Sequence, residues 1–332
     1  MPLTRPPSQY MSRLAAVLVG IGWAIAFTAL HHQVLPQPVQ AVPLLANVPN
    51  TSALAQVNWF EAIVLGMVQG LTEFIPISST AHLKVVPVAL GWGDPGVTFT
   101  AVIQLGSIGA VLWYFWQDIV DLSQGAWRAI RQSDWQATEF RIAVGIAVGT
   151  LPIVACGLLL KALIPNLDES PIRSLPAIAI ASIVMALLLA AAEKFGQRVR
   201  AFAQLNMSDG IIMGLAQSLA LIPGVSRSGS TITAGLFMGL ERATAARFSF
   251  LLGIPAITLA GLVQLKTDVL DANVEASAWL PLLIGTLSSA VFSYLAIAWL
   301  IKYLQKQNTW VFVWYRLIFG VVILAAVGLK WL

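Results

Sequence analysis

Long apolar stretches, each bounded by polar residues, dominate the pattern of this chain. Crossing a bilayer as a helix takes roughly 20 apolar residues. Of the stretches that reach this length, two contain a single arginine, Arg247 or Arg316, and the others contain no charged residue. The pattern predicts six transmembrane helices, over residues 97–117, 143–160, 174–192, 243–265, 276–301 and 310–329.

Two other apolar stretches, residues 60–90 and 211–240, are interrupted in the middle, around Pro76 and Pro223. Each half has about 14 residues and reaches only about 20 Å, which is less than the thickness of the bilayer core. Proline and serine end one helix and start another. We therefore interpret each stretch as a re-entrant pair of half-helices whose irregular backbone is buried in protein or faces a water-filled cavity.

The two broken stretches resemble each other, which indicates an internal repeat. Gln217 lies 148 residues after Gln69, and Pro223 lies 147 residues after Pro76. Three predicted spans follow each break, and an odd number of crossings inverts the second copy. The sequence predicts an all-α polytopic membrane protein with an inverted-topology repeat, in which each half is a re-entrant half-helix pair plus three transmembrane helices. Residues 57–332 form a single membrane-embedded domain, with repeat one over 57–195 and repeat two over 207–332.

Charges in the predicted loops alternate in sign along the chain. Because basic loops stay in the cytoplasm, the first break enters the membrane from outside, the second enters from the cytoplasm, and their tips meet near the midplane. The basic loop residues are Arg128, Arg131, Arg141, Lys194, Arg198, Arg200, Lys302 and Lys306. The acidic ones are Asp168, Glu169, Asp268, Asp271 and Glu275.

Residues 1–56 form an N-terminal extension outside the repeat. Arg5 and Arg13 precede an uncharged run over residues 14–30, which predicts either a retained extra transmembrane helix or a cleaved signal peptide. Either interpretation brings residue 57 to the outer side, as the loop charges require.

Composition excludes other classes of protein. The chain has 332 residues, of which 58% are hydrophobic and only 10% charged, whereas about 25% of residues are charged in a soluble domain. Too few polar residues remain to cover a water-facing surface. The formal net charge of +4 is small and scattered, which argues against nucleic acid as a partner.

The first break carries several polar residues. Gln69 and Glu73 lie four residues apart and share one helix face. Ser78 and Ser79 are placed to cap the next half-helix, and His82 lies in its first turn, three residues after Ser79. A helix N-terminus offers free N–H groups and a partial positive charge, which suits phosphate.

The second break adds hydroxyls and an arginine, whose guanidinium fork matches phosphate oxygens. Its residues are Ser226, Arg227, Ser228, Ser230 and Thr231. Taken singly, Ser79 could be a cap, His82 a core histidine, and Glu73 with Arg227 a structural ion pair. Ionisable residues at membrane depth are costly, however, and usually mark function. Together the two breaks predict an anion site equipped for phosphoryl transfer.

Both motifs resemble those of a known family. Gln69-Gly-Leu-Thr-Glu73-Phe-Ile-Pro-Ile-Ser-Ser79-Thr-Ala-His82 is similar to the first motif of the bacterial undecaprenyl-diphosphate phosphatases, the bacitracin-resistance family, and Pro223-Gly-Val-Ser-Arg227-Ser-Gly-Ser-Thr231 to the second. The resemblance covers about residues 57–332. It implies hydrolysis of undecaprenyl diphosphate to undecaprenyl phosphate and inorganic phosphate, in the bacterial plasma membrane, with the active site opening to the outer side.

The resemblance also implies roles for the site residues. Arg227 would clamp the diphosphate, together with the substrate-binding residues Gln69, Ser78, Ser226, Ser228 and Thr231. Glu73, with Gln69, would hold any divalent cation, Mg²⁺ or Ca²⁺. Either Ser79 or His82 would attack the terminal phosphorus or activate the attacking group, and the motif does not decide between them.

Two questions stay open from the sequence. Inverted repeats with broken helices also occur in transporters, so a secondary transporter or flippase of an anionic lipid is the alternative function. The small-residue run 145–149 fits packing within the chain as well as a homodimer interface.

Overall fold

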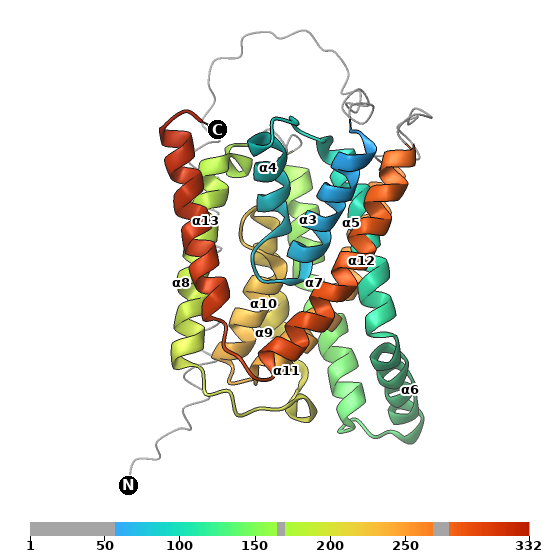
Figure 1. The fold of residues 1–332 in the computed structure, drawn as a ribbon. Helices are drawn as coiled ribbons and strands as arrows, with labels where there is room; N and C mark the ends of the chain where they lie inside the picture. Colours follow the sequence, from blue (N-terminus) through green and yellow to red (C-terminus); the bar gives the residue numbers. More distant parts are fainter. Residues whose placement is uncertain (1–56, 165–169, 268–278, 332) are drawn as a thin grey trace.

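The computed structural model describes residues 57–164, 170–267 and 279–331 (Figure 1). The predicted N-terminal extension and all the acidic loop residues named above lie outside these ranges. Within them, the chain is helical apart from its connections and one isolated bridge between Arg200 and Leu240.

Five helices in the described part of the chain are long and apolar enough to cross a membrane. Leu187, Leu287 and Val322 are examples of large apolar side chains that lie exposed on their outer faces, where lipid can cover them. The protein is therefore an all-helical, polytopic membrane protein. The five helices, which match five of the six predicted spans, are α7 (Thr138–Leu163), α8 (Leu175–Phe195), α11 (Arg242–Leu265), α12 (Trp279–Leu304) and α13 (Trp310–Gly328).

The remaining predicted span, residues 97–117, ends earlier than expected. Helix α5 (Gly96–Tyr114) stops at Phe115, where the chain bends by 62° into helix α6 (Trp116–Gln132). The hydropathy pattern did not predict α6, because charged residues such as Asp121 and Arg128 interrupt its apolar positions. Helix α6 packs against α7 and keeps these charged side chains exposed, as an amphipathic helix does.

Both broken stretches fold as pairs of half-helices: α3 (Trp59–Phe74) with α4 (Ser79–Ala89), and α9 (Met207–Ser218) with α10 (Arg227–Phe237). A 3-10 turn, η4 (Leu219–Leu221), follows α9. Each pair leaves the bundle at the end where it entered. The ring of Phe60, at the start of α3, contacts the ring of Trp92, which follows α4. Around the second pair, the backbone N–H of Arg200 donates a hydrogen bond to the carbonyl oxygen of Gly239. Figure 1 shows the first pair entering from the upper end and the second from the lower end.

Each pair begins with the same local signal, an asparagine capping box. The side chain of Asn58 accepts hydrogen bonds at the start of α3 while Glu61 reaches back to its backbone. Asn206 and Asp209 make the same arrangement at the start of α9. Such boxes satisfy N–H groups that would otherwise lack partners in the first turn.

Small residues allow close helix crossings that hold the outer half-helices in place. Glycines of α3 lie against α12, and glycines of α9 lie against α7, so closely that a Cβ would overlap the facing backbone. The 145–149 run is therefore used within the chain, and a homodimer would need another surface. The contacts are Gly66 with Gly285, Gly70 with Ser289, Gly210 with Gly145, and Gly214 with Gly149.

Candidate active site

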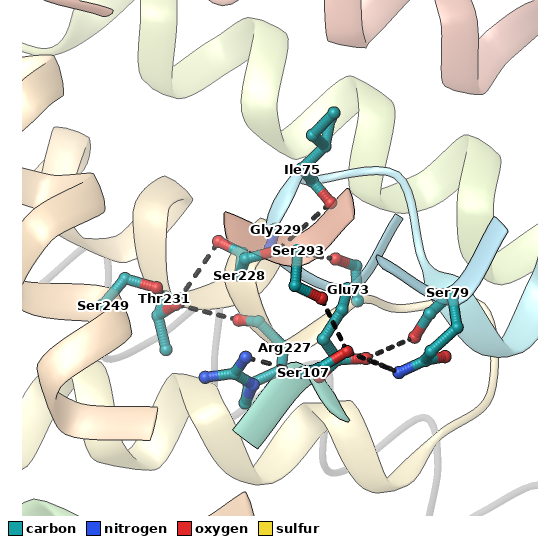
Figure 2. Close-up of polar contacts among 12 residues, drawn as sticks. Glu73, Ile75, Ser79, Ser107, Arg227, Ser228, Gly229, Thr231, Ser249 and Ser293 are labelled. Atoms are coloured by element: carbon teal, nitrogen blue, oxygen red, sulfur yellow. Dashed lines mark hydrogen bonds and ion pairs between the residues drawn. The ribbon is translucent and has the colours of Figure 1, made fainter. Parts of the chain in front are cut away.

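The two breaks meet inside the bundle, as the sequence predicted (Figure 2). Glu73 is the second-last residue of α3, near the tip of the first pair, and Arg227 is the first residue of α10. The Nη2 atom of Arg227 lies 3.4 Å from Oε1 of Glu73, and the two side chains are only 8% and 9% exposed. Ser228 Oγ also donates a 3.4 Å hydrogen bond to the carbonyl oxygen of Ile75. A buried ion pair at membrane depth thus joins the two tips.

The carboxylate of Glu73 accepts hydrogen bonds from two of the other candidates of the first break, Gln69 and Ser79. Ser79 Oγ donates to Oε2 of Glu73 at 2.7 Å, and Gln69 Nε2 donates to the same oxygen at 3.1 Å. Ser107 of α5 lies 3.4 Å from that amide nitrogen. It bonds Ser289 and Ser293 of α12 at 3.0 and 2.8 Å. Sequence reasoning missed these three serines, because a single hydroxyl in an apolar span gives no hydropathy signal.

Ser78 and Ser79 do not cap α4 with their side chains, so that prediction is wrong. Ser78 stands at the N-cap position but makes no side-chain capping bond, and its φ of 78° is unusual for a residue with a Cβ. The Ser79 hydroxyl points to Glu73 instead. The strained backbone of Ser78 is the kind of feature that clusters at functional sites.

The structure places His82 apart from this network. Its Nδ1 lies 2.7 Å from the carbonyl oxygen of Ser78, and its Nε2 lies 2.6 Å from the hydroxyl of Tyr315 on α13. The ring of Phe319 stacks on the imidazole with centroids 4.3 Å apart. Both ring nitrogens are therefore occupied by groups other than Ser79.

A glycine creates the space that Arg227 occupies. A Cβ added to Gly253 of α11 would overlap the guanidinium of Arg227. On another side, the guanidinium lies 5.7 Å from the ring centre of Phe74. Within the described chain its Nε and Nη1 are buried without a hydrogen-bond partner, which is costly for a charged group unless a ligand or water supplies one.

The remaining residues of the second break are all buried: Ser226, Ser228, Ser230 and Thr231. Ser226 caps α10 by accepting a 3.1 Å hydrogen bond from the Gly229 N–H, and it has a φ of 72°. Thr231 is fully buried and donates to the carbonyl oxygen of Arg227 at 2.8 Å. Ser228 is also fully buried. Of the hydroxyl residues in this break, Ser226 lines the cavity described below.

Arg316 is a buried charged residue that sequence reasoning did not place in the site. It is 1% exposed and donates hydrogen bonds to carbonyl oxygens at both breaks. Its signal in the sequence was a lone arginine within the apolar span 310–329. Its acceptors are Pro76 at 3.0 Å, Gly224 at 2.7 Å, Val225 at 3.1 Å and Ser182 at 3.2 Å.

A cavity of about 520 Å³ leads to the network. Polar residues of both breaks line part of it, and apolar residues of α7 and α11 line most of the rest. Leu158 and Val263 at its wall are 66% and 47% exposed, so the cavity opens between these helices toward the lipid. The polar lining residues from the breaks include Glu73, Ser78, Ser79, Ser226 and Arg227.

A charged site in a cavity that opens between exposed apolar helices of a membrane protein is suited to the anionic head of a lipid. The chain belongs to the family of the bacitracin resistance protein BacA, whose model matches residues 62–322. It is 62% identical over 309 residues to a protein of Synechocystis sp. named undecaprenyl-diphosphatase, covering 92% of this chain and 94% of that protein. It is 65% identical over 282 residues to a protein of Trichormus variabilis with the same name, covering 84% and 88%. These matches confirm the family that the two motifs indicated.

Proposed function

We propose that this protein hydrolyses undecaprenyl diphosphate to undecaprenyl phosphate and inorganic phosphate, the activity for which its relatives are named. This reaction recycles the lipid carrier of cell-wall synthesis and confers bacitracin resistance. The observation that carries the proposal is the Ser79 hydroxyl, hydrogen-bonded to Glu73 beside Arg227 in the polar part of a lipid-facing cavity.

The cavity accounts for both parts of the substrate. The isoprenyl chain lies between α7 and α11, where apolar side chains replace lipid around it. The diphosphate reaches the polar part, where Arg227 and the N-termini of α4 and α10 compensate its charge. Lys161, which lines the same cavity near the end of α7, attracts the anionic head group as it approaches.

Ser79 is the nucleophile in this mechanism. Glu73 removes the hydroxyl proton, and Oγ forms a bond to the terminal phosphorus. The bond from that phosphorus to the bridging oxygen breaks, and its electron pair leaves with undecaprenyl phosphate. Glu73 then releases its proton to solvent and deprotonates a water molecule, whose oxygen forms a bond to the phosphorus of the phosphoserine. The bond from that phosphorus to Oγ breaks, Glu73 returns the proton to Oγ, and inorganic phosphate is released. Arg227 stabilises the charge on the phosphoryl oxygens in both steps.

His82 positions the start of α4, since Ser78 and Tyr315 occupy its two ring nitrogens. The alternative, a histidine nucleophile, predicts a different intermediate. Rapid acid quenching of enzyme and labelled substrate should trap an acid-stable phosphoserine at Ser79. An acid-labile phosphohistidine at His82 would overturn the serine mechanism.

A divalent cation, Mg²⁺ or Ca²⁺, fits this site only together with the substrate. Glu73 is one carboxylate that already accepts hydrogen bonds, and no group of three or more His, Cys, Asp or Glu side chains suited to a metal occurs in the described residues. Mg²⁺ often binds one or two carboxylates plus substrate phosphates. The carboxylate of Glu73 and the side-chain amide oxygen of Gln69 would then hold the cation. The cation would neutralise charge on the diphosphate.

The inverted-topology repeat is part of the proposal, and several matched features support it. Asn58 and Asn206, which open the two half-helix pairs, lie 148 residues apart, as do Ser78 and Ser226 with their positive φ angles. Helix α3 packs on α12 in the way that α9 packs on α7. Those pairs are equivalent if repeat two is an inverted copy of repeat one.

We also propose that the protein lies in the bacterial inner membrane with its site open to the outer side. The connections that carry the basic loop residues lie at the lower end of the bundle in Figure 1, which the positive-inside rule assigns to the cytoplasm. In a Cys156→Ala background, an impermeant thiol reagent should label Leu90→Cys in intact cells. It should label Gln132→Cys only after permeabilisation, and the reverse pattern would contradict this orientation.

The activity itself is tested with purified protein in detergent. Phosphate release from undecaprenyl diphosphate is expected for the wild type, and a flippase would give no signal because detergent has no second side. Ser79→Ala and Arg227→Ala should each lose at least about 100-fold in kcat. Ser123→Ala, on the exposed face of α6, is the matched control. Wild-type rates in Arg227→Ala would contradict the assignment of the site.

A further inference from the structure

A second cavity, of about 260 Å³, reaches the same network from another direction. Residues of α3, α4 and α5 line it, together with Arg173 of the 3-10 turn η2 (Pro171–Arg173) that precedes α8. Ser79, Thr80, Gln104 and Gln264 line both cavities. The proposed nucleophile therefore lies where the two spaces meet.

The two cavities differ in chemistry. The first is walled largely by apolar side chains of α7 and α11. The second is lined by the cations Lys84 and Arg173, the amides Gln69 and Gln104, and the carboxylate of Asp94. Asp94 accepts a hydrogen bond from the Gly96 N–H at the start of α5, so its charge is directed partly to that helix end. The lining thus has more positive than negative formal charge.

These cations also lie on one side of the molecule. Lys84 and Arg173 belong to elements at the upper end of the bundle in Figure 1, opposite the end with the basic loops. Positive side chains that line a cavity favour an anion inside it.

The reaction supplies such an anion, and the first cavity is unsuited to release it. Once hydrolysis is complete, inorganic phosphate is an anion near neutral pH and must leave while the lipid product is still bound in the first cavity. The isoprenyl chain of that product occupies the space between α7 and α11.

We propose that the second cavity is a binding site for inorganic phosphate and the route by which it leaves, separate from the lipid route between α7 and α11. This inference rests on the proposed phosphatase function. Lys84 and Arg173 bind the released ion, and Gln69 and Gln104 line its path from Ser79.

Product inhibition by inorganic phosphate tests this site. The double variant Lys84→Glu/Arg173→Glu should raise the inhibition constant of inorganic phosphate at least tenfold, with KM for undecaprenyl diphosphate changed less than threefold. The matched variant Lys84→Arg/Arg173→Lys, which keeps both charges, should retain inhibition close to wild type. Lys161→Glu, in the first cavity, should have the opposite effect: a higher KM for the lipid and an unchanged inhibition constant.

Each result separates this inference from the proposed function. A wild type that releases no phosphate would overturn the function itself. An active wild type, with equal inhibition constants in the wild type and the Lys84→Glu/Arg173→Glu variant, would overturn only the phosphate route. If that variant is inactive, phosphorus NMR of inorganic phosphate with the detergent-solubilised protein replaces kinetics. Binding by the charge-conserving variant and not by the reversed one supports the site, and equal binding by both overturns it.

Discussion

The guanidinium of Arg316, on the last helix, donates a 3.0 Å hydrogen bond to the carbonyl oxygen of Pro76 at the first break. Its Nη2 donates to Gly224 and Val225 at the second break. One buried side chain therefore satisfies backbone acceptors of both re-entrant tips, which have no helical partners there. We infer from these hydrogen bonds that Arg316 holds the two tips, and with them Glu73 and Arg227, in place, so that it is a positioning residue.

Replacing Arg316 with lysine should lower both stability and turnover. A lysine ammonium keeps the charge but cannot reach four carbonyl oxygens in separate segments, and each buried acceptor left without a donor costs about 1–3 kcal/mol. We expect a loss of at least about 2 kcal/mol in the free energy of unfolding. We also expect a lower kcat, with a smaller change in KM. Thermal unfolding in detergent and phosphate release measure the two effects. Arg128→Lys, at an exposed position of α6, should change neither, and an Arg316→Lys enzyme with wild-type kcat would contradict the positioning role.

Gly253→Ala should displace the guanidinium of Arg227, because the added Cβ would overlap it. A misplacement of about 1 Å in a catalytic group can cost about 100-fold in rate, and we expect a loss of that size in kcat/KM. Gly109→Ala is the control, since nothing lies within 4 Å of a Cβ there. Adding Arg227→Lys to Gly253→Ala should recover part of the activity, because an ammonium is narrower than a guanidinium. Wild-type activity in Gly253→Ala would show that the glycine does not position Arg227.

His82 and Tyr315 should act as one unit in a double-mutant cycle. His82→Ala and Tyr315→Phe each remove the 2.6 Å contact between Nε2 and the hydroxyl, so the double variant should be hardly worse than His82→Ala alone. We expect each single variant to keep measurable phosphate release and to form phosphoserine. Strictly additive losses, with no activity left in His82→Ala, would favour a direct chemical role for the histidine.

Ser78 should gain stability from substitution by glycine. Its φ of 78° is strained for a residue with a Cβ, and its side chain makes no capping bond, so Ser78→Gly should stabilise the fold by about 1 kcal/mol. Ser78→Val should destabilise it by a similar amount or more. The melting temperatures of the two variants in detergent measure this difference. Equal values would show that the conformation is not strained, and a raised KM in both Ser78→Gly and Ser78→Ala would identify a substrate contact of the hydroxyl.

Much of the architecture was predictable, because hydropathy is a local property of the chain. A stretch of about 20 apolar residues predicts a membrane span wherever it packs, and a proline with serines close by, as at Pro76 and Pro223, predicts a break between two helices. Proline alone does not decide this, because Pro152 and Pro255 lie inside α7 and α11. The polar residue types at the breaks indicated the kind of site for the same reason: a carboxylate and an arginine at membrane depth need each other or an anion. Helix α6 escaped prediction because its amphipathic pattern has no long apolar run.

The tertiary structure alone decided which groups act together. Ser79 lies three residues before His82 and six after Glu73, yet its hydroxyl bonds the carboxylate, because the chain reverses between α3 and α4 and His82 turns toward α13. Arg316 and Gly253 take their roles from helices that reach the breaks only by packing. Residue types and their spacing thus determined a membrane-embedded anion site. The opposed entry of the two breaks determined which side chains share it, because side-chain contacts between distant segments depend on how the helices pack.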